Sequence, residues 1–138
     1  MNFKRWVMAS LGAFGVIAIT DFVIHQLWLG PFYQMHAQWW RSANEMQTLR
    51  GVMVTSEIAL AVLLTFIYSK GYEPGKQTLG QGFRFGFLMG LLLFLPSTLM
   101  QHFVYPYPIT LLFNWFIGGL IQITLAGIMI GYLYKPAK

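Results

Sequence analysis

The stretch Ile19-Thr-Asp-Phe-Val-Ile-His25 lies inside an apolar run that extends from about Trp6 to Leu29. A transmembrane helix needs about 20 residues, so this run is long enough to cross a membrane. An ionisable group inside such a helix is costly and marks a candidate functional site. Asp21 and His25 are four residues apart, which places both side chains on one face of the helix.

The composition favours an integral membrane protein. The 138 residues are 57% hydrophobic and only 9% charged, whereas a soluble domain has about 25% charged residues. So few charges cannot cover a surface that faces water, which predicts one membrane domain over residues 1–138. The absence of cysteine excludes disulfides, thiolate metal sites, cysteine nucleophiles and covalent haem attachment.

Four apolar segments have the length of membrane spans, at about residues 6–29, 49–68, 85–103 and 109–134. The basic residues adjoin these segments, so the net charge of +5 indicates topology, and no nucleic-acid partner is expected. Seven of them fall on one side of the membrane and two on the other. The larger set is Lys4, Arg5, Lys70, Lys76, Arg84, Lys135 and Lys138, and the smaller set is Arg41 and Arg50.

Because positive residues stay inside, both termini are expected in the cytoplasm. The first outer connection contains Gly30-Pro31, which is expected to stop the first helix. It also contains Ser42 and Glu45 at the spacing of a helix capping box. The predicted fold class is therefore all-α: a four-helix transmembrane bundle with both termini cytoplasmic and a short, partly helical outer loop between the first two helices.

Small residues recur along the last two spans, and such rows let helix backbones approach closely in lipid. The predicted helix-packing residues are Gly82, Gly86, Gly90, Gly119 and Gly127. Pro96 should kink the third helix, because it removes one backbone hydrogen bond.

In the predicted orientation, all four spans place polar side chains in the outer third of the membrane. We therefore expect a polar cup, open towards the outer face. The candidate residues are Asp21, His25, Glu57 and His102, with His36, Gln101 and Asn114 in supporting positions. A purely structural interpretation stays open, in which the carboxyl groups are protonated and the histidines lie at the membrane surface without binding anything.

The chemistry of the cup is also open. Two imidazoles and two carboxylates suit Zn²⁺, Cu²⁺ or Fe²⁺. His25 and His102 lie at similar depths, which leaves haem b as an alternative cofactor. Chains of Asp, Glu and His also form proton relays in membranes. The sequence contains no CxxC, HExxH, Walker or GxSxG motif, so it assigns no catalytic residue and does not decide whether the protein is an enzyme.

Several segments resemble a family of small bacterial inner-membrane proteins with four predicted transmembrane helices. They are Asp21-Phe-Val-Ile-His25, Tyr33, Trp40-Arg41, Glu45-Met46, and Trp115-Phe-Ile-Gly-Gly-Leu-Ile-Gln122 with Gly131-Tyr-Leu-Tyr-Lys-Pro136. The resemblance covers nearly the whole chain and implies the four-span layout and a bacterial inner membrane, but no substrate. The Asp-x3-His pair alone is more faintly similar to helix-borne metal ligands of the copper subunits of membrane monooxygenases.

Three functions remain as hypotheses. The first is a packing or accessory subunit, either a homo-oligomer or part of a larger membrane complex, which the small size and the glycine-rich faces favour. The second is a metal- or haem-binding protein, redox-active or catalytic, which uses the polar cup. The third is a small proton-coupled transporter, which the apolar cytoplasmic halves of the helices disfavour.

Overall fold

The computed structural model describes residues 2–134, and these residues form helices with no β-strand among them. The elements are α1 (Phe3–Phe22), the π-helix η1 (Val23–Trp28), α2 (Gly30–Met35), the 3-10 helix η2 (Ala37–Trp39), α3 (Ala43–Thr48), α4 (Arg50–Lys70), α5 (Thr78–Val104) and α6 (Ile109–Leu133). The predicted all-α fold is confirmed.

Within residues 2–134, four helices are long and apolar enough to cross a membrane: Phe3–Trp28, Arg50–Lys70, Thr78–Val104 and Ile109–Leu133. This is the composition of a small multi-pass membrane protein. The third helix begins at Thr78, earlier than the predicted residue 85. Its first turns contain polar residues and therefore resemble a connection in the sequence. The side-chain amide of Gln81 bonds back to Glu73 and Lys76 and fastens that connection to the helix. Lys135 and Lys138, used for the orientation, lie outside the described residues.

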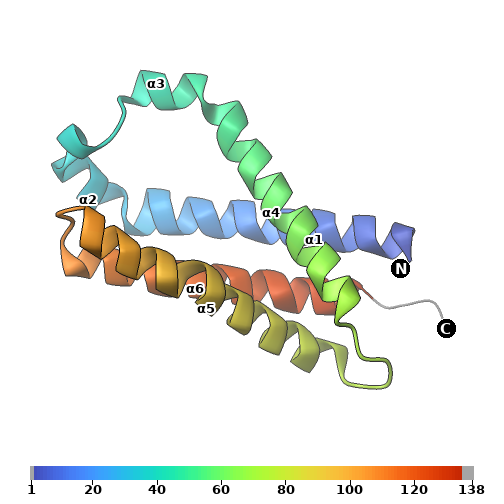
Figure 1. Ribbon diagram of the computed structural model, residues 1–138. Coiled ribbons are helices and arrows are strands. Elements are labelled where there is room, and N and C mark those ends of the chain that lie inside the picture. The colour runs from blue at the N-terminus through green and yellow to red at the C-terminus, as the bar shows by residue number, and fades with distance from the viewer. Residues whose placement is uncertain (1, 135–138) are drawn as a thin grey trace.

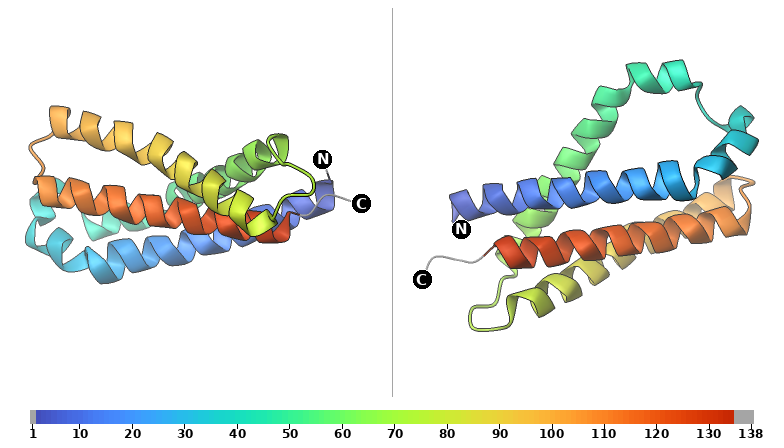
Figure 2. Two further views of the ribbon diagram at one scale, coloured as in Figure 1. Left: turned by 90° about the horizontal axis from the view of Figure 1, so that it is seen from below. Right: turned by 180° about the vertical axis from the view of Figure 1, so that it is seen from behind.

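Helix α6 is the central element of the fold. It packs against both α1 and α5, whereas α1 and α5 scarcely touch. Both views in Figure 2 show α6 between the other two helices. Helix α1 begins, and α6 ends, at the same end of the bundle (Figure 1). We call the opposite end, which carries α2 and the α5–α6 connection, the outer end, after the predicted orientation.

Glycine brings α5 and α6 into backbone contact. A Cβ added at Gly86 would lie 2.6 Å from the carbonyl oxygen of Ile123 and 2.8 Å from the Cα of Thr124. A Cβ added at Gly127 would lie 2.5 Å from the Cα of Gly86. Gly82 and Gly90 continue this row along the same face of α5. The glycine row therefore packs inside the chain, between α5 and α6.

The inner half of the bundle has an apolar core. Its buried members come from α1, α4 and the last turns of α6, and they are Ala9, Ala13, Ile17, Ala61, Leu64, Tyr68, Ile123, Ala126, Ile130 and Tyr134. Burial of side chains such as Ile17 and Leu64 contributes about 1.5–3 kcal/mol each in water, and in lipid the same contacts act through close packing. This core joins α4 to α1 near the inner end, opposite the outer end.

Towards the outer end, α4 leans away from the other helices. Every residue from 41 to 53 is exposed, and α3 has its main contact with α4, the helix that follows it directly. We call residues 41–53 the α3–α4 arm. Figure 1 shows the arm standing apart from α1, with an open angle between them. The predicted capping box is present at its start, where Ser42 and Glu45 exchange hydrogen bonds and begin α3.

The first span ends at Trp28, close to the predicted Leu29, but it is not α-helical throughout. The α-helical pattern stops at Phe22, well before Gly30-Pro31, and six π-helical residues follow. The wider turn is closed by the backbone N–H of Leu29, which donates to the carbonyl of Ile24 at 2.9 Å. Pro31 then lies in the first turn of α2, where its missing N–H costs no helical hydrogen bond.

Candidate functional site

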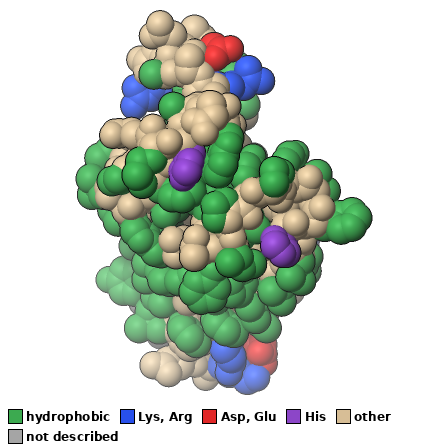
Figure 3. Space-filling view, turned by 90° about the vertical axis from the view of Figure 1, so that its left-hand side faces the viewer, with side chains coloured by type: hydrophobic (Ala, Val, Ile, Leu, Met, Phe, Trp, Pro, Cys, Tyr) green, Lys and Arg blue, Asp and Glu red, His purple; other side chains and the backbone are tan. Residues whose placement is uncertain are grey.

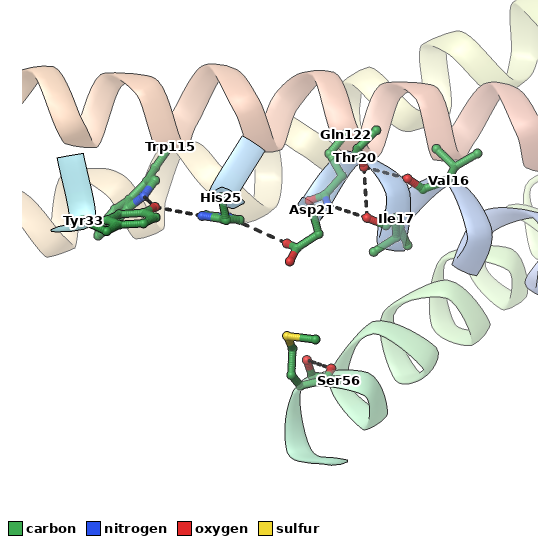
Figure 4. Close-up of polar contacts among 10 residues, drawn as sticks. Val16, Ile17, Thr20, Asp21, His25, Tyr33, Ser56, Trp115 and Gln122 are labelled. Carbon is green, nitrogen blue, oxygen red and sulfur yellow. Dashed lines mark hydrogen bonds and ion pairs between the residues drawn. The ribbon is translucent and has the colours of Figure 1, made fainter. Parts of the chain in front are cut away.

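A row of polar side chains runs along the outer half of the first span. The imidazole Nδ1 of His25 lies 2.8 Å from the hydroxyl oxygen of Tyr33. The indole N–H of Trp115 donates to the same hydroxyl at 2.7 Å. On the other side of the ring, Nε2 of His25 lies 3.7 Å from a carboxylate oxygen of Asp21. Figure 4 shows Trp115, Tyr33, His25 and Asp21 in this order.

The direction of these bonds follows from the donors. An indole N–H is a donor only, so the Tyr33 oxygen accepts from Trp115 and keeps its own proton to donate. With neutral His25, Nδ1 accepts that proton, and the ring hydrogen is on Nε2, facing Asp21. Burial raises the pKa of Tyr33, which keeps its hydroxyl protonated at neutral pH.

His25 also lines a cavity of about 250 Å³ at the outer end. The cavity has one polar wall on each side of α6, because the first span and α5 both contribute polar residues and pack on opposite sides of α6. The first span contributes His25, and α5 contributes Ser97, Thr98 and Gln101. Gln122 of α6 forms part of the floor.

The remaining lining is apolar and largely aromatic. Trp115 and Gly119 of α6 complete the floor, while Ile24 and Phe94 border it on the two sides. The ring of Phe94 occupies the space that a Cβ on Gly119 would need. Gly119 therefore differs from the glycine row, since it accommodates a side chain that lines the cavity.

Two local irregularities flank the cavity. The π-helix η1 carries Ile24 and His25, and π-helical turns are frequent at functional sites. Opposite, Pro96 lies inside α5, next to Ser97, whose hydroxyl donates to the carbonyls of Leu93 and Phe94. Below the cavity, the Gln122 amide donates to the carbonyl of Ile17 at 3.1 Å and ties α6 to α1.

The two predicted carboxylates lie near each other. Glu57 is buried, 9% exposed, and lies within electrostatic range of Asp21 on α1. Glu57 accepts no hydrogen bond from residues 2–134, in contrast to the carboxylate of Glu45. Figure 4 shows Asp21 pointing into the space between α1 and the start of α4, which carries Ser56.

His102 does not join this group. Gln101 lines the cavity, and the next residue along a helix points about 100° away, which leaves His102 exposed. His36 stacks on Trp39, with 4.4 Å between ring centroids, and is not part of the cavity lining. Figure 3 shows histidine side chains at two separate places, with charged side chains at the top, where α3 lies, and again at the bottom.

No group of three or more His, Asp or Glu side chains suited to a metal ion occurs within residues 2–134. Asp21 and His25 come together, Glu57 lies near Asp21, and His102 points elsewhere. Asn114 is half-buried and outside the cavity. Of the predicted cup, the residues that line one cavity are His25 and Gln101.

An aromatic cluster covers the outer end beside the cavity. Tyr33, Trp40, Tyr107 and Trp115 pack together, with the ring centroids of Trp40 and Tyr107 5.7 Å apart. This cluster fixes α2 against the start of α6. The sequence did not indicate Tyr33 as the partner of His25. That contact depends on the π-helix and on the chain reversal after Leu29.

No protein-family model, curated protein or solved structure matches this chain.

Proposed function

We propose that this small multi-pass membrane protein binds a small, membrane-soluble molecule in the cavity at its outer end. The observation that carries the proposal is the hydrogen bond between His25 and Tyr33. It holds an imidazole at the cavity wall, and Trp115 in turn fixes the Tyr33 hydroxyl. A polar side chain that is held in one orientation at the wall of a pocket is typical of a ligand site.

The surroundings support a ligand that dissolves in lipid. His25, Ser97 and Thr98 are only partly buried, so the cavity is accessible from outside the chain. The α3–α4 arm stands apart from α1, so the side of α1 that faces the arm is uncovered (Figure 1). The apolar inner core gives no support to a proton path across the membrane, and the scattered histidines give none to a metal or haem centre. We place the protein in a bacterial inner membrane on the resemblance alone.

The test is to fill the cavity. Thr98→Phe adds a ring at the cavity wall, and Leu99→Phe is the matched control, since Leu99 is 63% exposed and outside the lining. The proteins are purified from membranes in mild detergent, and bound small molecules are detected by native mass spectrometry. We expect about one bound molecule per chain in the wild type and in Leu99→Phe, and none in Thr98→Phe. Equal occupancy in all three proteins, or none in the wild type, would contradict the proposal.

A second candidate function is that of an accessory subunit, which binds its own copies or a larger membrane complex. The observation in its favour is the α3–α4 arm, whose residues are all exposed. The glycine row gives it no support, because those residues pack within the chain. A photo-crosslinker at Met46 should capture a membrane partner, whereas one at Leu88, a lipid-facing position that is 63% exposed, should not. Equal capture at both positions would remove this candidate.

A further inference from the structure

We propose that the ligand of the outer cavity is a six-membered ring with an oxygen substituent at each of two opposite edges, as in the head group of a quinone or its quinol. The proposal rests on the ligand-binding function above and names the class of ligand. It concerns binding only.

The size of the cavity suits a substituted ring. A cavity of about 150 Å³ accommodates benzene, and the outer cavity measures about 250 Å³. That volume leaves room for several small substituents but lies below the usual range of pockets for larger, drug-sized ligands, which begins at about 300 Å³. Phe94 and Trp115 provide flat, apolar surfaces for the faces of a ring.

The hydrogen-bonding groups lie on two facing walls. His25 is on the first span, and Ser97, Thr98 and Gln101 are on α5, across the floor formed by α6. A ligand with a single polar end would form hydrogen bonds with one wall and none with the other. A ring with oxygen atoms at opposite edges meets both walls at once.

The free atoms on these walls match such oxygens. Tyr33 occupies Nδ1 of His25. Nε2 lies 3.7 Å from the Asp21 carboxylate, which is longer than a hydrogen bond, so Nε2 is the imidazole atom that a ligand can bond. The Gln101 side chain makes no hydrogen bond within residues 2–134. Its amide can donate to a quinone carbonyl and accept from a quinol hydroxyl, so both forms of the ring can bind.

The test compares two probes of the same shape, tetramethyl-1,4-benzoquinone and 1,2,4,5-tetramethylbenzene. Their binding is measured by equilibrium dialysis against the full chain in lipid nanodiscs, with empty nanodiscs to subtract partitioning into lipid. We expect the quinone to bind at least about tenfold more tightly than the hydrocarbon, because it alone forms hydrogen bonds with the two walls.

Variants of the two walls locate the effect. His25→Ala and Gln101→Leu should each remove most of the quinone preference. His102→Ala is the control and should retain it, because His102 is exposed and outside the cavity. If His25→Ala fails to fold, Gln101→Leu on the other wall still tests the proposal.

The outcomes separate this proposal from the one on which it rests. Equal binding of both probes to the wild type, lost in Thr98→Phe, would overturn the quinone class while the cavity remained a binding site. A quinone preference that survives both His25→Ala and Gln101→Leu would overturn the assigned walls. Binding of neither probe would overturn the quinone class, and the ligand-binding function would fall with it only if the wild type also purified without a bound molecule.

Discussion

Tyr33 is the residue on which the orientation of His25 depends. Its hydroxyl is the meeting point of an indole N–H and an imidazole nitrogen, and each of these groups loses its partner when the hydroxyl is removed. Both hydrogen bonds are part-buried, and each contributes about 0.5–1.5 kcal/mol. A single oxygen atom thus couples α2, the first span and α6.

We expect Tyr33→Phe to lower the free energy of unfolding by about 1–3 kcal/mol, because Trp115 and His25 lose their hydrogen-bond partner. Reversible unfolding in mixed detergent measures the change, and nitrogen NMR should show a mixture of His25 tautomers. Tyr105→Phe is the control, since Tyr105 is exposed and stacks on Tyr107 through its ring. An unchanged His25 spectrum in Tyr33→Phe would contradict the assigned contact.

The capping box at the start of α3 predicts a pH dependence. Both the hydroxyl and the backbone N–H of Ser42 donate to the Glu45 carboxylate, which lowers the pKa of Glu45 below its ordinary value of 4.5. A lowered pKa in the folded state means that the cap stabilises α3 above the ordinary carboxyl range and that this stabilisation is lost as the pH falls through the lowered pKa.

Carbon NMR titration of the Glu45 carboxyl group tests this prediction. The midpoint should lie below 4.5 in the wild type and move upward in Ser42→Ala, because the hydroxyl donor is gone. Ser69→Ala, a change at the far end of α4, should leave the Glu45 titration unaltered. Identical midpoints in wild type and Ser42→Ala would show that the capping box does not form.

At the scale of the elements, the α5–α6 pair is the most closely packed part of the fold. Its glycine row replaces side-chain contacts with backbone contacts, and protein interiors of this kind have little space to absorb an added methyl group. Gly15, in contrast, has no atom near the position of an added Cβ. The two sites provide a direct comparison of the same substitution.

We expect Gly86→Ala to destabilise the protein by about 1–3 kcal/mol, because the added methyl group forces α5 and α6 apart. Gly15→Ala should have no destabilising effect, since the methyl group enters open space on α1. Thermal unfolding in one detergent compares the two variants with the wild type. Equal midpoints for both variants would contradict this prediction. They would mean that α5 and α6 can move apart at the glycine row without loss of stability.

Sequence patterns predicted where the helices lie along the chain better than which face of each helix points into the bundle. The four spans, the capping box and the position of Asp21 and His25 on one helix follow from hydrophobic length and residue spacing. The exclusion of His102 does not follow, because a span that is apolar all round gives no periodic signal of its orientation. The π-helix is equally hidden, since no residue in Val23–Trp28 marks a change from α-helical to π-helical turns.

At the scale of the whole molecule, the bundle is closed at its inner end and open at its outer end. The α3–α4 arm has few contacts to lose when it opens, whereas α6 is packed on several sides. Regions with few tertiary contacts exchange their amide hydrogens most readily. The difference in amide exchange rate between α3 and α6 therefore shows whether the arm is free of contacts with the rest of the bundle or with another chain.

We expect the amides of Ala43–Thr48 to exchange fastest among the helices and those in the middle of α6 to exchange slowest. Hydrogen–deuterium exchange with mass spectrometry on the protein in nanodiscs measures both regions in one experiment. If α3 exchanged as slowly as α6, the arm would be covered, either by the bundle itself or by a second chain. Dilution into excess lipid distinguishes these two cases, because only the contact with a second chain is lost.

The central place of α6 also governs the order in which the molecule can be assembled during synthesis. The bond from Gln122 to Ile17 joins residues 105 positions apart, and Trp115 must be present before Tyr33 has its indole partner. The ribosome thus delivers Asp21, Glu57 and the glycine face of α5 to the membrane before the helix that packs against them exists. During that interval the first three helices depend on lipid or on the insertion machinery for their contacts, so a pause in translation before α6 would leave the polar residues of the outer end without their final neighbours.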